Sequence, residues 1–132
     1  MAGLLVEQSA AREAARAALA IDIMDRNLYE RANDCRWWAL TTAFRTALAG
    51  KRVDGATVRQ LAEILRAING LYTVYSNLIL FDAEGRVVAV SDPKAEGLVG
   101  RILGEEWVRR TLALEHPQAY CVGAFAPSAL YA

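Results

Sequence analysis

The fold is decided by residues 73–93, Thr73-Val-Tyr-Ser-Asn-Leu-Ile-Leu-Phe-Asp-Ala-Glu-Gly-Arg-Val-Val-Ala-Val-Ser-Asp-Pro93. Two apolar runs in this stretch, Leu78–Phe81 and Val87–Val90, are rich in residues that favour β-strands. Between them, Asp82–Gly85 supplies turn residues and a glycine that is free to adopt positive φ. Pro93 bars a regular continuation of the second run. The stretch therefore predicts a β-hairpin.

Helical sequence precedes the hairpin. Residues 1–49 are predicted as one long helix, because good helix formers run from Glu7 to Leu48 without proline or interior glycine. The segment Gly50–Gly55 breaks this helix, with Gly50 suited to its C-terminal cap and Asp54 suited to cap a second helix over residues 54–69. One apolar face of the second helix is expected to cover the sheet: Val58, Leu61, Ala62, Leu65 and Ile68.

Residues 72–132 are predicted to hold the hairpin, a further helix and a third strand. A glycine-containing loop follows the hairpin, and Glu105-Glu106 favours a helix start by complementing the helix dipole. That helix is expected to run to Leu114 or Glu115, before Pro117, and Ala119–Phe125 is predicted as the third strand. The predicted fold class is α+β, with a long helix and a second helix packed on an antiparallel sheet.

Length and charge narrow the function classes. The chain has 132 residues, the size of one domain over residues 1–132, and 55% of them are hydrophobic. Its 15 basic and 15 acidic residues balance, so no overall charge favours binding to nucleic acid. No apolar run is long enough to span a bilayer, and the N-terminus lacks the pattern of a signal peptide. We therefore expect any membrane attachment to come from segments outside this chain.

The two cysteines, Cys35 and Cys121, lie far apart and form no zinc-binding pattern. We interpret them as small buried hydrophobic residues. A disulfide between the long helix and the third strand is the alternative, and it would require an oxidising compartment.

The long helix is expected to reach beyond the domain, because about forty residues at ~1.5 Å each measure roughly 60 Å. Part of it then projects or pairs with a second copy, and the alanine-rich start offers a narrow seam for a partner helix. Trp37 and Trp38 are consecutive and cannot share one helix face. We expect one of them to pack on the sheet and the other to meet a partner or solvent.

No catalytic site, metal site or cofactor is predicted. The chain's single histidine, His116, stands beside Pro117 at a predicted helix end, as a capping or loop residue does. Glu105 and Glu106 are adjacent and diverge on a helix, which is poor geometry for two carboxylates at one reaction centre. Gly97, Gly100 and Gly104 match no nucleotide-binding fingerprint, so they are read as turn residues.

The chain resembles the Cache family of PAS-like sensor domains over roughly residues 22–131. The resemblance rests on Phe81-Asp-Ala-Glu-Gly-Arg-Val-Val-Ala-Val-Ser91 and on Gly97-Leu-Val-Gly-Arg101. It implies an extracytoplasmic, periplasmic sensor region of a membrane receptor, although a cytoplasmic location stays open. It also implies a PAS-like sheet of about five strands, which is incomplete in this chain. The arginine, Trp-Tyr pair and aspartate of amino-acid-sensing members cannot be carried over to residues of this chain.

Aromatic and small polar residues near the hairpin and third strand suit a small-molecule pocket, since such pockets are mostly apolar with a few placed polar groups. Each residue taken alone is more often a packing residue. As a group they are favoured by the family's ligand cavity, which lies where the third strand meets the sheet. The predicted ligand-binding residues are Tyr75, Asn77, Trp107, Tyr120, Phe125, Ser128 and Tyr131, with Tyr72 also considered.

The resemblance implies a ligand-sensing domain of a bacterial signal-transduction receptor, not an enzyme. A small organic ligand, such as a carboxylate or an amino acid, is expected to bind and to shift the N-terminal helix within a homodimer. The alternative is a structural dimerisation module whose cavity is filled by its own side chains, Tyr75, Trp107 and Phe125.

Overall fold

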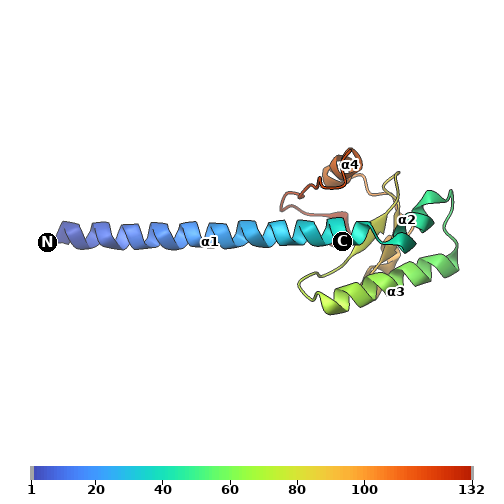
Figure 1. The fold of residues 1–132 in the computed structure, drawn as a ribbon, viewed down its shortest axis with the longest axis horizontal. Helices are drawn as coiled ribbons and strands as arrows, with labels where there is room; N and C mark the ends of the chain where they lie inside the picture. The colour runs from blue at the N-terminus through green and yellow to red at the C-terminus, as the bar shows by residue number, and fades with distance from the viewer. Residues whose placement is uncertain (1, 132) are drawn as a thin grey trace. The chain divides into compact units, whose positions relative to one another are not determined.

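The computed structural model describes residues 2–131 of the chain, with side chains from Glu7 onward. The chain divides into two compact units, residues 1–35 and 36–132. The elements, in chain order, are helices α1 (Ala2–Ala39), α2 (Thr42–Ala49) and α3 (Gly55–Leu71), strands β1 (Ile79–Phe81) and β2 (Val87–Val90), the 3₁₀ helix η1 (Pro93–Leu98), helix α4 (Glu106–Leu112) and the 3₁₀ helix η2 (Ala129–Tyr131) (Figure 1). The α+β class is confirmed.

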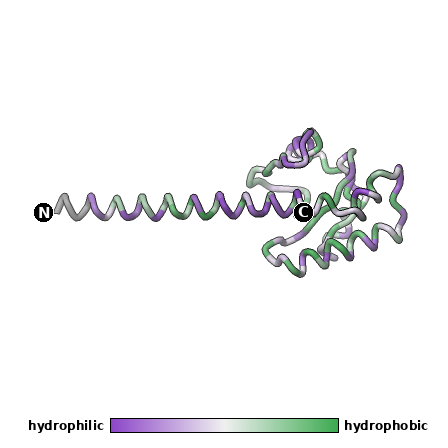
Figure 2. Tube along the Cα trace, in the orientation of Figure 1, coloured by the Kyte–Doolittle hydropathy of each residue, from purple (hydrophilic) through white to green (hydrophobic). Residues whose placement is uncertain are grey.

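The first unit is helical throughout its described residues and belongs to α1. Hydrophobic and hydrophilic residues alternate along this helix (Figure 2), and large apolar side chains in it are exposed. These side chains are Leu19, Ile21, Ile23, Met24, Leu28 and Tyr29. Within the described residues, no helix is both long and apolar enough to cross a membrane.

The prediction of one helix over residues 1–49 is wrong, because α1 ends at Ala39 and α2 begins at Thr42. The last turn of α1 tightens, with Leu40 N donating to Trp37 O at 3.1 Å and Thr41 N to Trp38 O at 2.9 Å. On one straight helix Trp38 and Phe44 would point about 120° apart, at 3.6 residues per turn. The break lets both side chains pack in one hydrophobic cluster.

The second helix forms nearly as predicted. Asp54 caps α3, with its Oδ1 accepting from Thr57 N at 2.7 Å, and the helix continues past the predicted end to Leu71. Its apolar face meets β2 in a cluster built around Phe44, Leu61, Leu65, Leu78, Val88 and Ala89. The expectation that this face covers the sheet is confirmed.

The hairpin is confirmed, with Ile79 opposite Val90 and Leu80 opposite Ala89 in an antiparallel pair. In the turn, Asp82 Oδ1 accepts from Glu84 N at 3.0 Å and from Arg86 N at 2.9 Å. Gly85 takes a φ of +79°, as the turn prediction requires. A second cluster packs on β2 through Val87, Val90, Leu98, Leu103 and Val108, so β2 is buried along its whole length.

The C-terminal predictions fail in two places. Helix α4 ends at Leu112, short of Leu114. Ala119–Phe125 is not a strand, and the sheet in the described residues has two strands only. This segment is rich in small residues, and Cys121 and Gly123 contact Trp107 of α4 in place of a strand partner.

The prediction that Cys35 is buried is also wrong, because its side chain is exposed in α1. Cys121 is half-buried, and both thiols are free, so the alternative of a disulfide is wrong as well. Of the two tryptophans, Trp38 packs against the α3 cluster and Trp37 is 75% exposed, as expected for consecutive residues.

Candidate functional site

A hollow of about 1340 Å³ lies between α4 and the C-terminal segment. Its walls are mostly apolar, and two charged side chains of α4, Glu106 and Arg110, border it. The residues of the C-terminal segment that line it are Gly123, Ala124, Phe125, Ala126, Pro127, Ser128, Leu130 and Tyr131. This hollow is the candidate binding site.

Glu105, at the N-terminus of α4, is hydrogen-bonded to residues from both walls of the hollow. Its Oε2 accepts from Trp107 Nε1 at 2.6 Å, and its Oε1 accepts from Ser128 Oγ at 2.8 Å and from Ala129 N at 3.1 Å. The Trp107 and Ser128 hydrogen bonds hold the pKa of this carboxyl below its usual value. Glu105 is the N-cap residue of α4 but makes no side-chain cap, because its carboxylate is engaged here.

Trp107, a residue of α4, packs against the C-terminal segment that forms the other wall of the hollow. Thr111 Oγ1 lies 2.8 Å from Cys121 Sγ and donates to Trp107 O, also at 2.8 Å. The Gly123 backbone passes so close to the Trp107 side chain that an added Cβ would lie 3.4 Å from its Cβ. The indole also meets Phe81 of the hairpin edge-on, with ring centroids 6.0 Å apart. Helix α4 thus connects the hairpin to the hollow.

The start of the C-terminal segment is held by Arg36, in the last turn of α1 and within the second unit. The Arg36 guanidinium donates to Gln118 O and lies over the Tyr120 ring, 5.2 Å from its centroid. A guanidinium in this position interacts favourably with the face of the ring.

Four predicted ligand-binding residues line the hollow, namely Trp107, Phe125, Ser128 and Tyr131. The polar groups of Trp107 and Ser128 are already bound to Glu105. The rings of Phe125 and Tyr131 are exposed. Their apolar surfaces are therefore what these residues offer to a ligand.

The structure places the other predicted residues elsewhere. Tyr75 packs edge-on against Trp38, with centroids 5.3 Å apart, and Tyr72, also considered, does the same at 5.1 Å. Tyr120 lies under Arg36. Asn77 sits at a polar junction beside β2, where its Oδ1 accepts from Asp92 N at 3.0 Å.

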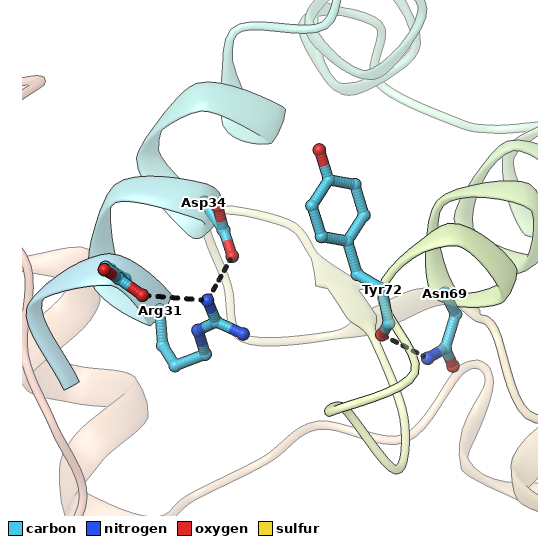
Figure 3. Close-up of polar contacts among 5 residues, drawn as sticks. Arg31, Asp34, Asn69 and Tyr72 are labelled. Carbon is cyan, nitrogen blue, oxygen red and sulfur yellow. Dashed lines mark hydrogen bonds and ion pairs between the residues drawn. The ribbon is translucent and has the colours of Figure 1, made fainter. Parts of the chain in front are cut away.

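This polar junction centres on Ser91, which is 2% exposed. Its Oγ accepts from Leu78 N at 2.7 Å and lies 2.8 Å from Asn69 Oδ1 and 3.1 Å from Asn77 Oδ1. Asn69 Nδ2 in turn donates to Tyr75 O at 2.8 Å, and to Tyr72 O at 3.5 Å (Figure 3). The junction ties the end of α3 to the hairpin and satisfies buried backbone groups, which is a structural role.

In the first unit, Arg31 Nη2 lies 3.6 Å from both Glu30 Oε2 and Asp34 Oδ2 (Figure 3). Such pairs at a helix surface contribute little to stability.

Sequence reasoning missed Glu105, Asn69 and Ser91 as organising residues. The sequence assigns Glu105 only a place at a helix start, where its charge complements the helix dipole. For Ser91 the signal was its position directly after an apolar strand and before Asp92-Pro93. A buried hydroxyl at such a strand end can form hydrogen bonds with backbone groups that the strand leaves without a partner.

Among residues 2–131, no group of histidine, cysteine, aspartate or glutamate side chains is arranged to hold a metal ion. His116 is exposed in the loop after α4. Comparison with family models, curated proteins and solved structures found no match. Function is therefore inferred from the chain's own residues.

Proposed function

We propose that this chain is a ligand-sensing domain of the Cache type, from a bacterial signal-transduction receptor. A small organic molecule binds in the hollow beside α4, and its binding is relayed through the N-terminal helix. The observation that carries the proposal is that Trp107, Phe125, Ser128 and Tyr131, named as binding residues from the sequence, line one hollow.

The PAS-like part of the proposal is supported by the hairpin and by α3 packed on it. In a PAS-like sheet, further strands lie beside such a pair. The proposed location is extracytoplasmic, as in the receptors that the sequence resembles.

The chemistry of the hollow favours a small organic acid or an amino acid with an apolar side chain. Arg110 offers a guanidinium that binds carboxylates through paired hydrogen bonds. Apolar surfaces of Phe125, Leu130 and Tyr131 lie in the same hollow. Glu105 is already fully engaged, so Arg110 and Glu106 are the charged groups that a ligand would meet.

The test is thermal unfolding of the 132-residue chain with panels of amino acids, organic acids and purines. A ligand at about 100 times its dissociation constant adds about 2.7 kcal/mol of stability, which is a shift of several degrees. Arg110→Gln should abolish the shift for a carboxylate ligand. Arg109→Gln is the matched control, because Arg109 is exposed on the same helix and does not line the hollow.

A shift that survives Arg110→Gln would place the ligand outside the proposed site. No shift with any compound, in a folded sample, would contradict the sensor proposal.

The second candidate, a structural dimerisation module, is favoured by one observation. Large apolar side chains of α1 are exposed, including Ile21, Met24 and Leu28 at three- and four-residue spacing. Such a stripe stabilises a helix by packing against another helix. A homodimer through α1 belongs to both candidates, and ligand binding distinguishes them.

A further inference from the structure

Residues 118–131, here called the strap, form one wall of the hollow and also reach the last turn of α1. We propose that the strap moves as one cooperative unit, and that Arg36 is the positioning residue through which it passes a change in the hollow to α1. This inference rests on the proposed sensing function, because it names the route by which that signal would leave the site.

The far end of the strap is held by a charged acceptor. Ser128 Oγ and Ala129 N both donate to the Glu105 carboxylate. Ser128 Oγ also accepts from Leu130 N at 3.2 Å, and Tyr131 N donates to Ser128 O at 3.1 Å. The Ser128 hydroxyl thus links the turn at residues 128–131 to the Glu105 carboxylate, beside the direct bond from the Ala129 amide.

The near end is held by the guanidinium of Arg36 and by the hydrogen bond from Ala119 N to His116 O. Arg36 binds the strap twice, through Gln118 O and through the face of the Tyr120 ring. Because Arg36 belongs to α1, a shift of Gln118 or Tyr120 acts directly on that helix turn.

Between the two ends, the strap depends on side-chain contacts. Residues 119–127 form no helix or strand, so no backbone ladder fixes them. The contacts there are made with α4, by Cys121 with Thr111 and by Gly123 with Trp107. A segment held by few contacts opens at low free-energy cost.

Trp107 joins these contacts to the far end. Its indole N–H donates to Glu105, and its carbonyl oxygen lies 3.4 Å from Cys121 Sγ. A ligand that displaces the strap from Trp107 therefore disturbs the middle of the strap and its far end together.

The test is amide hydrogen exchange, measured residue by residue on the ligand-free chain. Arg36→Gln removes the near-end contacts and should speed exchange at the far-end Ala129 amide by about tenfold, as expected when a charged hydrogen bond is lost. Arg36→Lys, which keeps a cation and a donor, should restore most of the protection. Arg45→Gln is the matched control, because Arg45 is an exposed arginine of α2, outside both the strap and α1.

The reciprocal variant is Ser128→Ala, which weakens the far end by removing the hydroxyl bonds to Glu105 and Leu130 N. It should speed exchange at the Ala119 amide, which donates to His116 O at the near end. The Ser91 amide, bound to Leu78 O in the hairpin, lies outside the strap, so Ala129 should exchange faster than Ser91 in every variant if the strap opens without the hairpin.

Faster exchange confined to the mutated end would overturn the proposal. A common exchange rate for the Ala129 and Ser91 amides would mean that the strap opens only with the whole fold, and would also overturn the proposal. Because no ligand is present, failure of this test is distinct from failure to find a ligand.

Discussion

Glu105 is the residue on which the shape of the hollow depends most. Its carboxylate receives hydrogen bonds from a side chain of its own helix and from the strap. A charged acceptor strengthens such bonds, and the same bonds stabilise the charge. Stability of the strap is thereby coupled to protonation of one group.

Acid should open the strap. The pKa of Glu105 in the folded chain lies below its ordinary value of 4.5. Its contribution is therefore fully present above pH 4.5 and is lost as the pH falls through the folded pKa. Glu105→Gln, measured by denaturant unfolding from pH 7 to pH 3, should lower stability by about 1 kcal/mol at pH 7 and should flatten the acid decline.

The capping Asp54, whose pKa is also lowered, remains in both proteins, so the difference between their profiles isolates Glu105. Glu106 and Arg110, the other charged residues at the hollow, are likewise unchanged. Parallel profiles for the two proteins would contradict the role of the Glu105 charge.

Residue type alone predicted part of the candidate site. Trp107 and Tyr131 were named because aromatic side chains suit a ligand pocket, and both line the hollow. Tyr75 and Asn77 were also named for their residue types. In the structure Tyr75 packs against Trp38, and Asn77 belongs to the polar junction at Ser91. The role of Glu105 depends on a strap 23 residues away in sequence, which no local pattern encodes.

At the scale of elements, two glycines lie in opposite environments. Gly85, in the hairpin turn, has a φ of +79°, and a Cβ there would lie 3.1 Å from Leu103 O and 3.3 Å from Val108 Cγ1. Gly70, near the end of α3, has open space around it.

Alanine should therefore have opposite effects at these two positions. Gly85→Ala should destabilise the chain by about 2 kcal/mol or more, from the left-handed backbone and the close contacts. Gly70→Ala should stabilise it by about 0.5–1 kcal/mol, because alanine is the better helix former. Denaturant unfolding of both variants checks the signs, and equal effects would contradict the assigned turn geometry.

The elements that were predictable are those whose signals are local. The hairpin follows from Asp82 and Gly85 between two apolar runs, and the start of α3 follows from Asp54. The helix break at Leu40-Thr41 contains no proline or glycine, so no local signal predicts it. It is set by the packing of Trp38 and Phe44 in one cluster. Ala119–Phe125 has strand-like composition in part, but its partner is the α4 surface.

For the molecule as a whole, the two core clusters both lie in residues 36–132. The first unit has large exposed apolar residues along a single helix. A lone helix in water gains most of its stability from packing on a partner. A second copy of α1 supplies such a partner under either proposed function.

The full chain should then form a dimer that depends on the Ile21, Met24 and Leu28 stripe. One buried isoleucine is worth about 1.5–3 kcal/mol, so Ile21→Glu should weaken association by about tenfold or more. Arg26→Glu, a charge change at an exposed position of α1 outside the stripe, is the control. Sedimentation equilibrium measures both, and a wild-type chain that stays monomeric at high concentration would contradict the dimer.

The surroundings of the three tryptophans also determine the intrinsic fluorescence of the chain. Trp37 is exposed, and its fluorescence is open to quenchers in solution. Trp38 is in contact with two tyrosine rings, which can pass excitation energy to it. Trp107 is hydrogen-bonded to Glu105 and packs against Gly123 of the strap, so its emission wavelength depends on whether the strap lies against it. The protein thus carries its own optical reporter at the hollow, and the exposed Trp37 serves as an internal reference.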